Sequence, residues 1–179
     1  MENETNTMRY KMVLFGNEKV GKTSLVERFI NNRFIEDYLY NLGYNIYEKI
    51  ISYQKYLISL MIYDIGGQEK FDVVRKIYAR GADTAFIIYD ITNKKSFNNL
   101  KKWRDDLYKY AGIIPFMIIG NKIDLENKRK VSKQELINTS KELNAIGYFE
   151  TSAKTGEYVD MAFNQLAIET LKTHLSKNA

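Results

Sequence analysis

Apolar residues along the chain follow two alternating patterns. Short apolar runs, typical of buried strands, occupy residues 9–15, 44–52, 57–63, 85–89, 116–119 and 148–150. Stretches with the spacing of amphipathic helices lie between and after them, at residues 22–31, 96–110, about 133–143 and 158–175, with a shorter one ending near residue 80. A capping box of Ser132 and Glu135 marks the start of the helix that ends near Leu143. Residues 32–43 have no clear period, which indicates a loop.

This alternation predicts an α/β fold of three layers, in which helices cover both faces of a mostly parallel six-stranded sheet. Only residues 53–56 separate the second and third strands, so a hairpin is expected to make one edge of the sheet antiparallel. A chain of 179 residues suits one domain. We assign it to residues 8–176, between a flexible tail at 1–7 and a short one at 177–179. Ligands of such sheets bind beyond the carboxyl ends of the strands, so residues that follow strands are the candidates for chemistry.

The segment after the first strand, residues 16–23, reads Gly-Asn-Glu-Lys-Val-Gly-Lys-Thr and matches the phosphate-binding loop G-x-x-x-x-G-K-[ST]. Its glycines let backbone N–H groups converge on phosphate oxygens, and the following helix adds its positive N-terminal end. Lys22 is expected to reach the terminal phosphates, and the Thr23 hydroxyl to ligate Mg²⁺. The strand–loop–helix context argues against a chance glycine-rich turn. The predicted phosphate site comprises Gly16, Asn17, Glu18, Lys19, Val20, Gly21, Lys22, Thr23 and Ser24.

An acidic residue follows the third strand, where residues 64–69 read Asp-Ile-Gly-Gly-Gln-Glu. Alone, this segment is no more than a strand-to-helix turn. Beside a phosphate loop, the carboxylate of Asp64 suits Mg²⁺, directly or through water, because Mg²⁺ prefers oxygen ligands and retains several waters. Asp64 is therefore a candidate metal-binding residue.

Residues 120–124, Gly-Asn-Lys-Ile-Asp, follow the fifth strand and suit the recognition of guanine. Guanine presents two neighbouring donors, its ring N1–H and its exocyclic amine, and the one carboxylate of Asp124 can accept both. Adenine lacks this pair and would leave a desolvated carboxylate unpaired, which is strongly unfavourable. After the sixth strand comes Thr-Ser-Ala-Lys at 151–154, where the Ala153 N–H is expected to meet the guanine oxygen. The predicted base site comprises Asn121, Lys122 over the base plane, Asp124, Ser152, Ala153 and Lys154.

Composition excludes several other classes of function. The chain has no cysteine and one histidine, which excludes disulfides and thiolate metal sites. Its net charge of +5 comes from short, dispersed Lys and Arg clusters, which indicate solvated faces rather than a nucleic-acid-binding patch. No apolar run approaches the ~20 residues of a membrane span, and no signal peptide or myristoylation site is visible. We therefore expect a cytosolic protein without a stable membrane anchor, unless a C-terminal extension supplies a prenylated cysteine.

In their order and spacing these motifs resemble those of the Ras superfamily of small GTPases over residues 8–176. Residues 78–83 and 89–97 are most similar to the Rab branch. The resemblance implies a P-loop NTPase G domain that binds GTP and GDP with Mg²⁺, hydrolyses GTP and acts as a switch in vesicle-mediated transport. It also implies exchange factors, activating proteins and effectors as partners. By position, Phe34 would pack against the guanine and Tyr38 would cover the phosphates. The Gly67 N–H would hold the γ-phosphate, and Gln68 would orient the attacking water.

Three features depart from the family pattern. Asn41 stands where a first-switch threonine usually ligates Mg²⁺, and the phosphate loop carries Glu18 and Lys19 at positions that are often small or uncharged. The second switch reads Asp-Ile-Gly at 64–66 instead of Asp-Thr-Ala. We expect this third departure to have only a mild effect on GTP hydrolysis. Two hypotheses follow. The first is a slow GTPase, favoured by Gln68 and by the complete set of base-recognition residues. The second is a nucleotide-binding interaction module with little or no turnover, favoured by Asn41 and Glu18. A P-loop kinase or ATPase is disfavoured, because Asp124 selects guanine and no second substrate lobe is evident.

Overall fold

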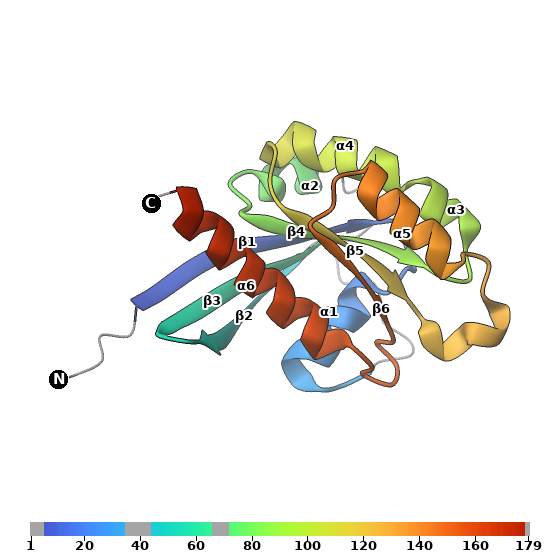
Figure 1. Cartoon of the computed structure of the whole chain (residues 1–179), viewed down its shortest axis with the longest axis horizontal. Coiled ribbons are helices and arrows are strands. Elements are labelled where there is room, and N and C mark those ends of the chain that lie inside the picture. The colour runs from blue at the N-terminus through green and yellow to red at the C-terminus, as the bar shows by residue number, and fades with distance from the viewer. Residues whose placement is uncertain (1–5, 35–43, 66–71, 178–179) are drawn as a thin grey trace.

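The computed structural model describes residues 6–34, 44–65 and 72–177, and within them six strands form one sheet (Figure 1). Their spatial order is β2-β3-β1-β4-β5-β6. Their bounds are β1 Asn6–Gly16, β2 Tyr44–Tyr53, β3 Tyr56–Ile65, β4 Thr84–Asp90, β5 Phe116–Asn121 and β6 Gly147–Thr151. Every neighbouring pair is parallel except β2 with β3, which form an antiparallel hairpin at the edge. The predicted fold class is confirmed.

Helices cover both faces of this sheet, as Figure 1 shows. On one face lie α1 (Lys22–Asn31) and α6 (Val159–Lys177), and on the other lie α2 (Asp72–Ala79), α3 (Lys94–Asn98), α4 (Leu100–Ala111) and α5 (Lys133–Glu142). Alternation along the strands explains the two layers, since Met12 belongs to the α1–α6 core and its neighbour Val13 to the other. Phe163 of α6 stacks on Phe29 of α1, with ring centroids 4.2 Å apart. The core therefore fixes α1, and with it the end of the phosphate loop, against the sheet.

Some element boundaries differ from the prediction. The helix expected over 96–110 is divided into α3 and α4, which meet at Asn99, although Asn99 keeps right-handed helical dihedral angles. A short 3₁₀ helix, η2 (Ile123–Lys128), was not predicted, because six residues are too few to show a period. The first strand begins at Asn6, which pairs with Tyr56, so part of the segment assigned to the tail belongs to the sheet. The capping box of Ser132 and Glu135 is confirmed.

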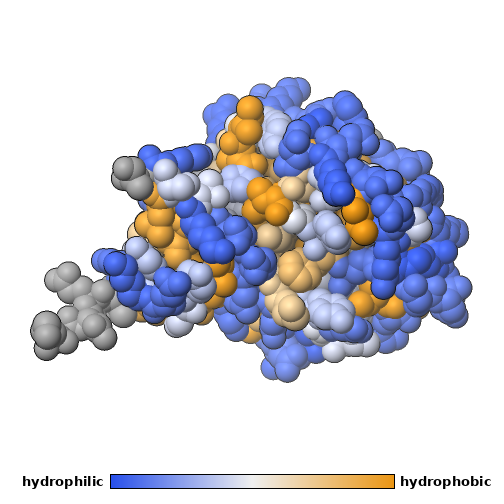
Figure 2. Space-filling model, in the orientation of Figure 1, coloured by the Kyte–Doolittle hydropathy of each residue, from blue (hydrophilic) through white to orange (hydrophobic). Residues whose placement is uncertain are grey.

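Figure 2 shows the face that carries α6, where hydrophilic residues cover most of the surface and apolar residues reach it in separate places. Among the residues that the structure describes, no helix combines the length and the apolar character that crossing a membrane requires.

Candidate nucleotide-binding site

The carboxyl ends of the parallel strands bring the predicted segments to one edge of the sheet. There β1 ends at Gly16, β3 at Ile65, β4 at Asp90, β5 at Asn121 and β6 at Thr151. The phosphate loop, Asp64, the 121–124 segment and the 152–154 segment all begin at or beside these ends. This is where an open α/β sheet binds its ligands.

The glycines of the phosphate loop are required by close approaches that a side chain would block. Gly16 has φ +144°, and a Cβ there would lie 2.3 Å from the carbonyl oxygen of Ile88. Gly21 has φ +100°, and a Cβ there would lie 2.3 Å from Nδ2 of Asn121. Gly21 also caps α1, and no side chain caps this helix end by a hydrogen bond. The first N–H groups of α1 therefore point out of the helix toward the loop, as a phosphate-binding helix end requires.

Lys22 lies inside this loop with only 6% of its surface exposed. Its Nζ donates hydrogen bonds to the carbonyl oxygens of Gly16 at 2.9 Å and of Asn17 at 2.7 Å. Burial is the main cause that lowers the pKa of Lys22 to about 8; the positive charge of Arg75 acts in the same direction, and the carboxylates of Asp64 and Glu18 partly offset both. The amine of Lys22 is thus desolvated and lies across the loop. This is the position from which it is expected to contact the terminal phosphates of a nucleotide.

Thr23 and Asp64 form the pair that fits a magnesium ion. Asp64 is 5% exposed, and its pKa is raised by burial, an effect that a hydrogen bond from Thr23 and the charge of Lys22 partly offset. Its Oδ1 is buried and accepts no hydrogen bond from the described residues. A buried carboxylate oxygen without a donor is costly unless a cation or water meets it. The hard oxygens of Thr23 and Asp64 therefore suit Mg²⁺.

Asn121 ties three loops of the site together. Its buried Nδ2 donates to the carbonyl oxygen of Val20 in the phosphate loop at 3.0 Å. Its Oδ1 accepts from the Thr151 hydroxyl and from the Ala153 N–H, both at 3.2 Å. One side chain thus fixes the base-binding segments against the phosphate loop, which sets the spacing between the two halves of a nucleotide.

Lys122 and Asp124, which follow Asn121, are also held by side chains of the site. The Nζ of Lys122 donates to the carbonyl oxygen of Lys19 at 2.7 Å and pairs with Asp90 at 2.6 Å, so its stem crosses the space between these loops. The hydroxyl of Ser152 donates to Oδ1 of Asp124 at 2.6 Å. Ser152 therefore orients the carboxylate that sequence analysis assigned to guanine.

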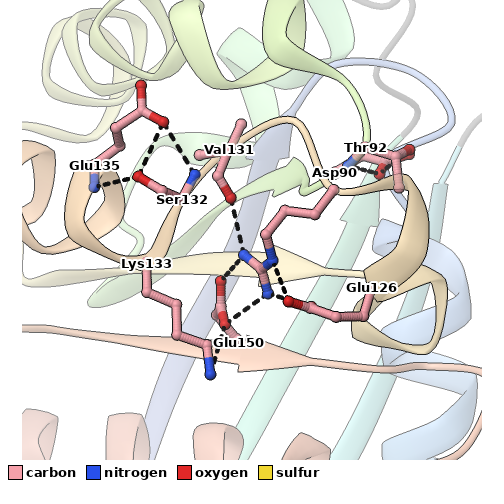
Figure 3. Close-up of polar contacts among 9 residues, drawn as sticks. Asp90, Thr92, Glu126, Val131, Ser132, Lys133, Glu135 and Glu150 are labelled. Carbon is pink, nitrogen blue, oxygen red and sulfur yellow. Dashed lines mark hydrogen bonds and ion pairs between the residues drawn. The ribbon is translucent and has the colours of Figure 1, made fainter.

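Two arginines brace the base-binding loops from outside. Arg28 of α1 donates from Nε to the carbonyl oxygen of Ala153 at 2.8 Å and from Nη2 to that of Lys154 at 2.5 Å. Arg129 links Glu126 of η2 with Glu150 of β6, through contacts of 2.5–3.0 Å (Figure 3). Bidentate Arg–carboxylate pairs fix geometry as well as adding energy. The loops that carry Asp124 and Ala153 are consequently held at a defined distance.

Comparison with known proteins decides the family, since residues 11–172 match the Ras family. The chain belongs to the Ras family. It is 36% identical over 167 residues to Ras-related protein Rab-7a of Dictyostelium discoideum, covering 90% of this chain and 82% of the relative. It is 37% identical over 163 residues to Ras-related protein Rab-13 of Canis lupus familiaris, covering 90% and 80%, respectively. It is also 36% identical over 169 residues to the Ypt/Rab-type GTPase YPT7 of Saccharomyces cerevisiae, covering 90% and 81%.

This Ras-family protein is thus a Rab-like small GTPase, a switch in vesicle trafficking that binds GTP and GDP with Mg²⁺. Its partners are exchange factors, activating proteins and effectors. The predicted alternative, an interaction module with little or no turnover, gains no support from these relatives.

Part of the site predicted for this Ras-family chain lies outside the described residues, namely Tyr38, Asn41, Gly67 and Gln68. Phe34, the predicted guanine contact, is described and is 37% exposed. Glu18 and Lys19 are both exposed.

Sequence reasoning missed five contributors to the Ras-family site: Arg28, Asp90, Arg129, Glu150 and Trp103, whose indole N–H donates to Oδ1 of Asn17 in the phosphate loop. Asp90 could have been found, because it follows a buried strand at the carboxyl edge, as Asp64 does. The other four lie on helices, in a loop or inside a strand, where nothing local marks them. The hydrogen bonds by which they join separate segments of the site span 21 to 126 residues along the chain.

Proposed function

We propose that this GTPase hydrolyses GTP slowly and that Glu18 is a main cause. The supporting observation is the position of Glu18, whose exposed side chain lies in the phosphate loop and whose charge acts on buried Lys22. Lys22 is the amine that must bind the terminal phosphates, so Glu18 competes with them for its charge.

The proposal assigns each residue a role at the nucleotide. Backbone N–H groups of residues 16–24 bind the phosphates with Lys22, and Tyr38 and the Gly67 N–H close over them. Asp124 accepts the two guanine donors, Ala153 donates to the guanine oxygen, and Phe34 and Lys122 pack on the base. Thr23, Asp64 and Asn41 would hold Mg²⁺, which neutralises phosphate charge when bound. Gln68 orients the attacking water.

Hydrolysis of GTP relies on positioning and on stabilising charge at the transferred phosphoryl group. A carboxylate beside that group opposes the developing negative charge, and it can pair with the arginine of an activating protein. Such an arginine adds about 10³–10⁵-fold in rate. The neighbouring Lys19 is exposed, so screening by solvent limits how far it neutralises Glu18. We therefore expect slow intrinsic hydrolysis and a weak response to activating proteins.

Single-turnover GTP hydrolysis tests this proposal in the parent and in Glu18→Gln, Glu18→Gly, Asn41→Thr and Glu18→Gly/Asn41→Thr. Glu18→Gln removes charge at nearly constant size, and Glu142→Ala, which removes an exposed carboxylate from α5, is the matched control. We expect both Glu18 variants to be faster than the parent, the double variant to be fastest, and Glu142→Ala to match the parent. A parent already as fast as ordinary small GTPases, and unchanged by these substitutions, would contradict the proposal.

We also propose a cytosolic location for the chain, supported by its lack of cysteine. Cell fractionation of the tagged chain tests this, and recovery in a secreted or organelle-lumen fraction would contradict it.

A further inference from the structure

Trp103, the one tryptophan of the chain, connects three elements of the structure. It lies on α4 and is 5% exposed. Its Nε1 donates a 2.8 Å hydrogen bond to Oδ1 of Asn17 in the phosphate loop. Its ring makes an edge contact with Phe15 of β1 and carries the guanidinium of Arg75 from α2, whose carbon is 5.3 Å from the ring centroid. The phosphate loop, the central strand and α2 therefore share one side chain.

The side chain of Asn17 is held by residues outside the phosphate loop, while its backbone contacts Lys22 within the loop. Its Oδ1 accepts hydrogen bonds from both Trp103 and Asn99 Nδ2, the latter at 3.2 Å. Its carbonyl oxygen accepts from the Nζ of Lys22. Asn17 directly follows the strand end at Gly16, so fixing its side chain fixes the backbone at the beginning of the loop. The indole N–H therefore contacts a loop residue whose carbonyl oxygen also accepts from Lys22.

Arg75 contacts the ring of Trp103. It is 5% exposed, and a buried guanidinium needs a defined partner because desolvating a charge is costly. Arginine over an indole face is such a partner. α2 begins at Asp72, shortly after the segment that contains Gln68, so the second switch leads directly into the helix that bears Arg75. The positive charge of Arg75 also acts on Lys22.

We propose that Trp103 is a positioning residue that couples α2 to the phosphate loop, through its indole N–H on Asn17 and its ring face on Arg75. This inference rests on the proposed binding of phosphates by residues 16–24. According to this proposal, the orientation of α2 determines how firmly Trp103 holds the phosphate loop, and therefore how long a nucleotide stays bound.

Release of a fluorescent GDP from the full chain tests the contact with Asn17. Trp103→Phe keeps a ring but removes the N–H, and loss of one such hydrogen bond corresponds to about fivefold faster release. Asn17→Ala should also speed release, and adding Trp103→Phe to Asn17→Ala should change the rate no further, since the shared contact is already gone. Lys102→Ala removes an exposed cation near the same ring and should match the parent. Leu107→Ala, a buried change on the same helix, should lower the melting temperature without reproducing the faster release.

Tryptophan emission tests the contact with Arg75, since all of it comes from Trp103. Replacing GDP by a non-hydrolysable GTP analogue should change the emission of the parent, and Arg75→Gln should reduce that change while Lys102→Ala preserves it. Equal release from Trp103→Phe and parent, effects of Trp103→Phe and Asn17→Ala that multiply, or an equal acceleration by Leu107→Ala would each overturn the inference. So would an emission change that Arg75→Gln leaves intact. A parent that binds no GDP would overturn the proposed function together with the inference, whereas the other outcomes bear on the inference alone.

Discussion

Replacing Asn121 by alanine should loosen the whole nucleotide site, because Asn121 connects three of its loops. The substitution removes the hydrogen bonds to Val20, Thr151 and Ala153. It leaves two buried donors and one buried acceptor without this partner. A net contribution of about 1 kcal/mol per hydrogen bond gives a loss of about 3 kcal/mol. That energy corresponds to about 150-fold in affinity if all of it reaches the bound nucleotide.

GDP dissociation measured with a fluorescent analogue is the direct assay of this change. We expect release from Asn121→Ala to be about 30- to 150-fold faster than from the parent, the lower figure allowing for partial relaxation of the loops. Asn138→Ala, which removes an exposed asparagine from α5, is the matched control and should release GDP at the parent rate. Release within about twofold of the parent would refute the reasoning, since three buried hydrogen bonds would then contribute almost nothing to nucleotide binding.

Three further predictions concern the base, the core and the response to acid. Asp124→Asn should weaken GTP binding by roughly 100-fold and improve binding of xanthosine triphosphate, whose ring oxygen suits an amide donor; competition binding measures both, and unchanged GTP affinity would show that Asp124 does not contact the base. Phe163→Ala should lower the free energy of unfolding by about 3–5 kcal/mol in GDP-saturated denaturant titrations, because the fully buried ring packs on Phe29 and Phe86; a loss below about 1 kcal/mol would contradict this packing. Hydrogen bonds from Lys94 and Ser132 lower the pKa of Glu135 from 4.5 to about 2, so its charged form stabilises the fold above pH 4.5, and this contribution disappears as the pH falls toward 2. Between pH 4.5 and 2, Glu135→Gln should therefore lose less stability than the parent. Melting temperatures measured at low salt test this, and an equal decrease with pH in the two proteins would exclude the effect.

The sequence allowed prediction of which segments meet at one edge of the sheet wherever the signal is local. The phosphate loop, Asp64 and the 121–124 segment each lie within a few residues of a strand end, so the strand pattern alone placed them at one edge. The capping box of Ser132 and Glu135 was predictable for the same reason, since both partners lie within one helical turn.

Contacts between distant residues could not be predicted in this way. Trp103 looks like an ordinary core residue of an amphipathic helix, and only the packing of α4 against β1 brings its N–H to Asn17. Arg28 looks like a surface residue of α1 until the fold places the loop after β6 beside it. The polar residue Asn6 shows no strand pattern and belongs to β1 only because β3 extends alongside it. In each case the decisive partner comes from another element.

The central claim is that residues 16–24 and Asp124 together bind a guanine nucleotide. Denaturing the purified protein and identifying the released nucleotide by chromatography tests this claim most directly, with the Asp124→Asn variant prepared in parallel. The account predicts GDP or GTP in near-equal molar ratio to the parent protein, and a strongly reduced guanine content in the variant. An adenine nucleotide in the parent, or equal guanine content in the two proteins, would contradict it.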